Sequence, residues 1–372
     1  KHYSAMSIIL ANLLHADTGN RQLLFTRATK NDNEIFIRCF DYLADQGLIS
    51  MTVAAPRKEV SSWAVANDEL ISLLAIHEAR IVFNGDINPV EVRDSRGKPK
   101  RVTHRADKLA VKRLSKFIDS YNRYWLDHSV TLKSAPVIPF LKRIFNKKLT
   151  LGGRFYGDYQ RLPSKHRKHI LIDGQKTVEV DYSSLHLAIL YAMSGVKMEG
   201  DAYTIDGYER SVIKLLCLRL VNSENLAGLK AVITLSANPK NGAKYKKYKD
   251  DRASFEWSRS KGLTGKEPRK PKWVDSFIPN MPTNVNANDL LEAFLIKHEP
   301  IRHLIGQKDI GLTLQREDSE LIASCMKQLY DLGIPVLPVH DSLICKRSDR
   351  PQVVMVMQGC FYSKYGQSIS VK

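Results

Sequence analysis

The sequence has no apolar run that approaches the length of about 18 residues typical of a membrane-spanning helix, and no secretory signal peptide is visible. Its five cysteines are scattered, odd in number and without a Cys-x-x-Cys pair. This spacing argues against a disulfide framework or a zinc ribbon and favours a reducing, cytoplasmic setting with no membrane partner. The chain starts at Lys1 rather than Met, so what precedes it is left open.

Acidic residues are scarce relative to basic ones. Lysine and arginine together number 57 against 39 aspartates and glutamates, which gives a formal net charge of +18. Such a surplus makes polyanions the expected partners. At 372 residues the chain is long enough for two domains and a large core.

Residues 1–68 are expected to form a small unit. Apolar residues recur at helical spacing before Gly47, and two short alternating segments follow. This order of helices and a strand ribbon is that of a winged helix, and the alternative is a helical cap on the main domain. Residues 69–150 are expected to be mostly helix, broken by the turn-rich stretch from Asp94 to Arg101.

Residues 151–372 carry clearer strand and helix patterns. A strand through Val178 and Val180 leads into a helix from Leu185, with Ser183 and Ser184 as candidate N-caps. Further helices are expected over 207–222, 288–305, 317–332 and 351–365, and two strands are expected to turn at His340–Asp341. Residues 240–272 hold 12 basic and 4 acidic residues with interleaved aromatics and no sustained period, which predicts a mobile cationic insert.

Two acids stand at strand ends, Asp181 and Asp341. If their strands are neighbours, both carboxylates project from one edge of the sheet. Paired carboxylates suit two Mg²⁺ ions held about 3.5–4 Å apart, which clamp the oxygens of a phosphoryl transfer. Mn²⁺ is an alternative occupant, whereas no His/Cys cluster suggests zinc.

A pair of cations lies on the helix expected over 207–222. Arg210 and Lys214 are four residues apart and therefore share one helical face, where they could cradle a triphosphate. The alternative is an amphipathic surface helix with two solvated cations.

Four segments resemble, in the correct order, the motifs of family A polymerases, the polymerase-I-type and phage-type single-subunit enzymes. "VEVDYSSLHLAIL" is similar to their first carboxylate motif, and "VLPVHDSLICK" to their His-Asp hairpin. Arg210-x-x-x-Lys214 resembles the start of their fingers helix, and "GGRFYGDYQRLP" their Gly-Arg segment. The resemblance implies an α+β fold: a right-hand polymerase palm, an antiparallel sheet flanked by helices, with reduced fingers over 151–372. A mainly helical N-terminal part, thumb-like over 69–150, would precede it, in a protein of bacterial, phage or mobile-element origin.

The resemblance also implies roles for single residues. Asp181 and Asp341 would be catalytic and would bind both metals, with the backbone carbonyl of Tyr182 as a third ligand. Arg210 and Lys214 would hold the incoming nucleoside triphosphate. His186 would lie beside the sugar of the nucleotide. Arg154 and Gln160 would contact the duplex of template and primer, and His340 would contact the primer end. The insert would contact nucleic acid through Lys244, Lys246, Lys247 and Lys249.

Departures from the pattern leave three functions open. His186 stands where polymerase-I-type enzymes carry Glu, and Asn222-Ser223 replaces the Tyr-Gly that ends their fingers helix. The leading hypothesis is a template-directed nucleotidyltransferase, with a DNA polymerase weakly preferred over an RNA polymerase or a primase. The alternatives are a catalytically degenerate nucleic-acid-binding protein of replication or regulation, and a metal-dependent nuclease for which Asp318 is an extra carboxylate. The oligomeric state, the template type and the need for a primer stay open.

Overall fold

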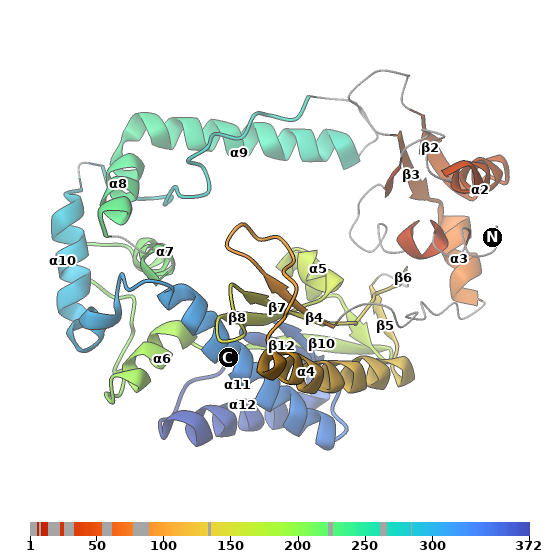
Figure 1. Ribbon diagram of the computed structural model, residues 1–372. Coiled ribbons are helices and arrows are strands. Elements are labelled where there is room, and N and C mark those ends of the chain that lie inside the picture. Colours follow the sequence, from red (N-terminus) through yellow and green to blue (C-terminus); the bar gives the residue numbers. More distant parts are fainter. Residues whose placement is uncertain are drawn as a thin grey trace.

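The computed structural model describes residues 6, 9–13, 23–25, 33–53, 62–76, 89–132, 135–221, 226–260, 266–283 and 285–372. Helices and strands alternate in a mixed α+β arrangement with mainly antiparallel sheets, which confirms the expected class (Figure 1). In the part of the chain that the structure describes, no helix combines the length and the apolar composition needed to cross a bilayer. All five cysteines are buried, and no disulfide joins them in the part of the chain that the structure describes.

The N-terminal unit has its own small core. Its elements are β1 (Leu23–Phe25), α2 (Asn33–Asp45), β2 (Ile49–Thr52), β3 (Ser62–Ala66) and α3 (Asp68–Ile76). The strands form an antiparallel sheet in the order β1-β3-β2. Phe40 and Leu43 of α2 pack with Ile49 and Ala64 of the strands, so the expected helix and ribbon are present. Membership of the winged-helix class stays a prediction.

The segment from Val90 to Asn146 is not mostly helix, and that expectation is wrong. It contains the strands β4 (Val90–Arg93), β5 (Val130–Leu132), β6 (Ala135–Pro136) and β7 (Lys142–Asn146), with the helix α4 (Arg105–Tyr124) and the short η1 (Trp125–Asp127) between them. The strands are too short to show a period of their own and gain their stability from the sheets they join. The boundary expected at residue 150 falls between the paired strands β7 and β8, and one core runs from Val90 to Ile369.

The C-terminal region supplies the rest of the main body. Its elements are β8 (Gly152–Tyr156), η2 (Asp158–Arg161), α5 (Ser164–Arg167), β9 (Leu171–Ile172), β10 (Gln175–Asp181), α6 (Leu185–Met193), α7 (Arg210–Val221), α8 (Leu226–Ala237), α9 (Pro239–Ser260), α10 (Ala287–Lys297), η3 (Glu299–Leu304), α11 (Ile310–Asp331), β11 (Leu337–Val339), β12 (Ser342–Lys346), η4 (Arg347–Asp349) and α12 (Arg350–Tyr365). The strand, the hairpin and the helices expected here are thereby confirmed, although α11 begins seven residues earlier than the expected 317.

Two sheets lie in the main body. A six-stranded sheet has the order β11-β12-β10-β9-β5-β6, and a three-stranded sheet has the order β4-β7-β8. Helix α11 packs against β8 and α6, while α12 packs against α11 and β10. In Figure 1, α11 and α12 lie along the sheets, and α7, α8 and α10 form a separate group of helices from which α9 extends.

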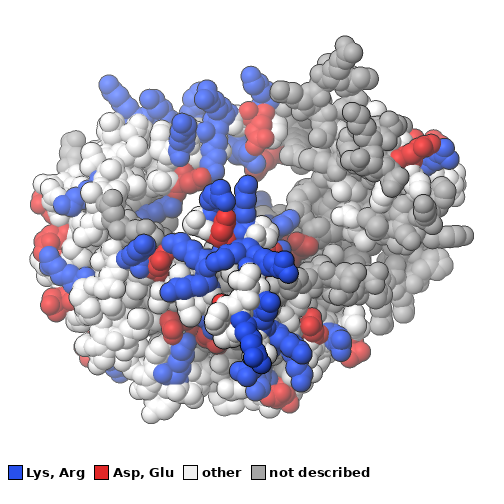
Figure 2. All heavy atoms as spheres, in the orientation of Figure 1, with Lys and Arg blue, Asp and Glu red and all other residues white. Residues whose placement is uncertain are grey.

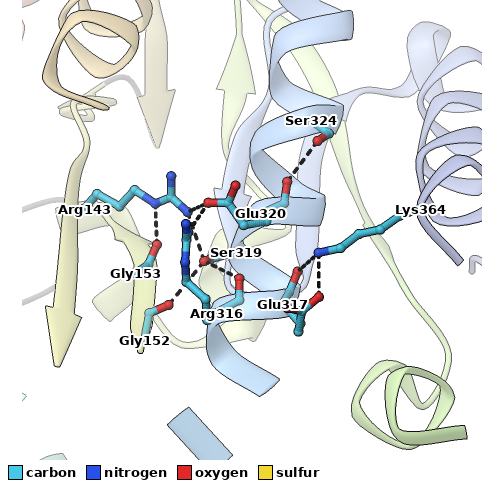
Figure 3. Close-up of polar contacts among 9 residues, drawn as sticks. All are labelled: Arg143, Gly152, Gly153, Arg316, Glu317, Ser319, Glu320, Ser324 and Lys364. Carbon is cyan, nitrogen blue, oxygen red and sulfur yellow. Dashed lines mark hydrogen bonds and ion pairs between the residues drawn. The ribbon is translucent and has the colours of Figure 1, made fainter. Parts of the chain in front are cut away.

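A buried arginine fastens α11 to the hairpin of β7 and β8 (Figure 3). The Arg143 side chain is 2% exposed; its Nε donates to the Gly153 carbonyl, and its Nη2 lies 2.5 Å from Glu320 Oε1 and 3.1 Å from Ser319 Oγ. Gly153 has φ +83, and a Cβ there would lie 2.6 Å from the Phe145 ring, so only glycine fits this close approach. The turn before Arg154 and the helix that carries Asp318 are thus held in one position.

The insert over 240–272 is not the mobile segment that its composition predicted. Residues 239–260 form α9, and residues 266–272 have no regular secondary structure. Most of its residues are polar or charged, so an apolar period is hard to recognise in the sequence. Lysine, arginine and alanine favour helix, and the pairs Lys247–Asp251 and Arg252–Glu256 stabilise it at i,i+4 spacing. Tyr245 stacks on Phe277 at 4.5 Å between ring centroids, which anchors the start of the helix.

Candidate active site

The two strand-end acids lie side by side because β10 pairs with β12. The antiparallel register places Asp181 opposite Ser342, the residue that follows Asp341. The hairpin turns at His340, which has φ +57, and the buried run Leu343–Cys345 fixes the register because a slip by one residue would expose it. The expected juxtaposition of the two carboxylates is therefore confirmed as geometry.

A pocket of about 400 Å³ opens in front of these acids. Eight residues singled out in the sequence line it: Arg154, Asp181, Tyr182, His186, Arg210, Lys214, His340 and Asp341. They come from β8, β10, α6, α7 and the β11–β12 turn, five elements that are distant in the sequence. Gln160 and the insert lysines Lys244, Lys246, Lys247 and Lys249 do not line it.

The carboxyl of Asp181 is strongly perturbed. Desolvation raises its pKa to about 7, helped by the charges of Asp341 and Glu179, while Lys214 acts in the opposite direction. The side chain also faces the open pocket, where the charges of the two neighbouring carboxylates act on it directly. The two carboxylates repel each other, so a bound cation would stabilise both of them in their charged form.

The backbone around Asp181 is held by the end of the described chain. Asp181 N donates to the Lys372 carbonyl, Lys372 N donates to the Asp181 carbonyl, and Ser183 N donates to the Ser370 carbonyl. None of these hydrogen bonds uses the Tyr182 carbonyl. The Tyr182 side chain turns into the core, where its hydroxyl donates to the Met357 carbonyl at 2.6 Å, so only its backbone is available to a ligand.

The start of α6 differs from the expected cap. Ser184 occupies the N-cap position, but with φ 54 and without a capping hydrogen bond from its side chain. The buried Ser183 hydroxyl has no hydrogen-bond partner among the described residues. Both serines line the pocket, so this turn presents polar groups to its interior.

Arg154 and His186 are joined by a buried carboxylate. Asp318 of α11 is 0% exposed; Arg154 Nε lies 3.0 Å from its Oδ2, and the Arg154 Nη2 donates to the same oxygen. His186 Nε2 lies 2.9 Å from Asp318 Oδ2 and 3.2 Å from Arg154 Nη2. Asp318 thus orients two pocket residues and is not free to act as a third acid beside Asp181.

Arg210 and Lys214 lie on α7 with their side chains exposed, and both line the pocket. Arg210 pairs with Asp201, with 2.6 Å from Nε to Oδ2, and its guanidinium lies 5.1 Å from the centre of the Tyr203 ring. Hydrogen bonds from Arg210 hold the pKa of Asp201 well below its usual range. An anion that enters the pocket would compete with Asp201 for Arg210.

His340 lines the pocket, whereas Gln160 does not. Desolvation, followed by the charge of Arg154, lowers the pKa of His340, whose ring lies 6.3 Å from that of Tyr156. Gln160 Nε2 donates to the carbonyls of Phe155 and Pro338, at 3.1 and 2.7 Å. Gln160 therefore holds the hairpin in place from behind the pocket.

The lining residues that were missed in the sequence include Tyr203, Gln315 and Lys372. Gln315 is three residues before Asp318 on α11, so the helical period could have indicated its shared face. No local signal points to Lys372. In the ranges that the structure describes, no three His, Cys, Asp or Glu side chains form a group able to hold a metal.

Comparison with known proteins finds similarity among solved structures and not among protein families or curated proteins. No known family matches the chain, and no curated protein matches it. The chain is similar to the POL domain of Pol1 from M. smegmatis in complex with DNA primer-template and dNTP, at 11% identity and a TM-score of 0.29, over 100% of this chain and 65% of that one. A likeness this distant carries no argument, so the function is inferred from the pocket.

Proposed function

We propose that the protein catalyses template-directed nucleotidyl transfer at the pocket between β8, β10, α6, α7 and the β11–β12 turn. The observation that carries the proposal is the pairing of β10 with β12, which joins Asp181 and Asp341 in one pocket with Arg210 and Lys214. Carboxylates beside cations are the combination that phosphoryl transfer from a triphosphate requires.

The donor set fits Mg²⁺. Asp181, Asp341 and the Tyr182 carbonyl would hold two ions, since hard oxygen ligands suit magnesium and also Mn²⁺. The raised pKa of Asp181 beside Asp341 supports a place for positive charge there. When bound, the ions would lower the pKa of a primer 3′-hydroxyl and neutralise the pyrophosphate that leaves.

The cations of α7 would bind the triphosphate. Lys214 already acts electrostatically on Asp181, so a phosphate held by Lys214 would lie close to the carboxylates. Arg210 would exchange the Asp201 carboxylate for phosphate oxygens, which offer it the same bidentate geometry. Asp201 would thus keep Arg210 oriented until the nucleotide arrives.

The opposite wall would contact sugar and primer. His186, held by Asp318, presents a bulky ring at the first turn of α6, which favours deoxyribonucleotides by crowding a 2′-hydroxyl. Arg154 would lie along the duplex and His340 at the primer end, while Gln160 would act through the hairpin that it supports. The four lysines of α9 would contact the nucleic-acid backbone outside the pocket.

Primer extension tests the proposal. The wild-type chain is incubated with primer, template and Mg²⁺, with deoxyribonucleotides and ribonucleotides in separate reactions. Asp181→Asn and Asp341→Asn are each expected to lower incorporation by at least a hundredfold, because the loss is electrostatic at the reacting centre, while thermal unfolding stays within about 2 °C of wild type. Asp331→Asn, at the exposed end of α11, is the matched control and should retain full activity.

The same assay separates the alternatives. Full activity in either pocket variant would overturn the two-metal proposal. A wild-type chain that binds nucleic acid but never extends a primer would instead be a regulatory or replication protein on a degenerate palm. Cleavage of the template without extension would indicate a nuclease, which the engagement of Asp318 by Arg154 does not favour.

A further inference from the structure

A second cationic surface lies away from the pocket and from α9. It consists of the loop between β4 and α4 and the outer face of α4, with the exposed cations Arg96, Lys98, Lys100, Arg101, Arg105, Lys108, Lys112, Arg113, Lys116 and Arg123. Figure 2 shows lysines and arginines gathered over the middle of this face of the molecule, apart from those along its upper edge. We call this set the α4 surface.

The outer face of α4 is a regular stripe. Arg105, Lys108, Lys112 and Lys116 follow one another at intervals of three or four residues, so they project from one side of the helix. Ile118 and Tyr121 are buried on the opposite side, which fixes the stripe toward solvent. No ion pair within the described ranges engages these four cations. The helix carries two exposed acids, Asp107 between Arg105 and Lys108 and Asp119 after Lys116.

Hydrogen bonds hold the loop before α4 in a defined conformation. Asp94 Oδ1 accepts hydrogen bonds from the backbone of Arg96 and Lys98 at 2.8 and 2.9 Å, and Gly97 turns with φ +76. The backbone N–H of Lys100 donates to the Val92 carbonyl at 2.7 Å. Among the residues that the structure describes, Arg96 is the one cation in an ion pair with Asp94. The hydrogen bonds hold the backbone that carries the other cations in a defined conformation.

We propose that the α4 surface binds the phosphate backbone of a nucleic-acid duplex. The stripe from Arg105 to Lys116 covers about 16 Å of helix, the length of about five base pairs along a duplex axis. Cations that repeat at this spacing along one face of a helix match a regular row of phosphates. The binding extends the proposed function, since it supplies a place for the duplex outside the pocket.

The absence of exposed aromatic rings on the α4 surface favours a duplex over a single strand. Phe117, Tyr121 and Tyr124 of α4 pack inward, against each other or against Tyr330. Single-strand binding relies on bases that stack on exposed rings. Helix α9 differs, because Trp257 is 62% exposed beside its lysines.

Salt-dependent binding tests the inference. A variant with Lys108, Lys112, Arg113 and Lys116 all changed to Ser is compared with a control variant that removes the same charge at scattered exposed sites, Lys230, Lys297, Lys308 and Lys327. Binding of a 20-base-pair duplex of random sequence is measured by fluorescence anisotropy between 50 and 300 mM KCl, without Mg²⁺ or nucleotide, so the result does not depend on catalysis. Each lost phosphate contact lowers the slope of log affinity against log salt by about 0.9.

We expect the α4 variant to flatten the slope by about 3.6 and to weaken duplex binding at least a hundredfold at 100 mM salt, with the control variant close to wild type. Circular dichroism confirms that both variants are folded. Equal slopes in the two variants would overturn the inference, as would a loss confined to single strands or to vesicles of anionic lipid. A chain that fails to extend primers but shows the α4 effect would refute only the proposed function.

Discussion

Removing the charge of Asp318 tests whether one buried carboxylate organises a wall of the pocket. Asp318 is 0% exposed and is the shared partner of Arg154 and His186. Asp318→Asn keeps the size of the side chain but leaves the Arg154 guanidinium, 17% exposed, without its counter-charge. Breaking a buried ion pair from one side costs about 3–5 kcal/mol. Because Asn retains one acceptor and Asp341 acts on Arg154 from the pocket, we expect the lower end, about 3 kcal/mol.

The measurement is thermal or urea unfolding followed by circular dichroism. For a unit of this size, each kcal/mol corresponds to about 2 °C in Tm, so Asp318→Asn should lower Tm by about 6 °C. Glu317→Gln, the neighbouring residue on α11, is the matched control. Its carboxylate is 30% exposed and pairs with Lys364 at 2.7 Å (Figure 3), and a surface pair of this kind contributes at most about 1 kcal/mol.

A third variant separates the charge from the packing. Arg154→Met with Asp318→Leu removes both charges and leaves no unpaired ion, so its stability should recover most of the loss. Equal Tm shifts in Asp318→Asn and Glu317→Gln would refute the reasoning. No recovery in the double variant would assign the loss to packing and not to the unpaired arginine.

Two further predictions concern other parts of the molecule. Desolvation lowers the pKa of the buried His298 to about 4, and its ring nitrogens lie 3.0 Å from Tyr191 Oη and the Ala202 carbonyl. The neutral ring therefore contributes its full share to the free energy of unfolding above the ordinary pKa of about 6.5. This free energy should fall by about 3 kcal/mol as pH drops from 6.5 to 4. Urea titrations of wild type and His298→Gln at pH 7 and pH 4.5 should show this pH dependence only in wild type, and parallel curves would contradict it. Changing Lys244, Lys246, Lys247 and Lys249 to Ser should flatten the slope of log affinity for single-stranded DNA against log salt by about 3, since each contact with a single strand contributes about 0.7. An unchanged slope would mean that α9 does not contact nucleic acid.

Local patterns in the sequence predicted much of the C-terminal region. The alternation through Val178 and Val180, the apolar run of α6 and the hairpin at His340–Asp341 each carry a short-range signal, and all three elements are present. The i,i+4 spacing of Arg210 and Lys214 likewise needs only the helical period. These features depend on neighbours within a few residues, so the sequence alone determined them.

Other features depend on contacts between distant segments. The strands between Val90 and Asn146 are two to five residues long, and part of the pairing that stabilises them is with distant strands, β5 with β9 and β4 with β7. Helix α9 has few apolar residues, so its period is hard to recognise in the sequence, and ion pairs and helix propensity help to stabilise it. The sequence analysis missed these strands and this helix because the periodic spacing of apolar residues is the main signal that a single sequence offers.

The site shows the same division. Asp181 and Asp341 were recognisable as strand-end acids, but only the register of β10 against β12 decides that they share a pocket. The engagement of Arg154 and His186 by Asp318 and the place of Lys372 beside Asp181 follow from packing across the whole chain. Residue types and local spacing determined which groups were available, and tertiary structure decided which of them meet, because a contact between distant residues forms only when the buried elements that carry them are packed together.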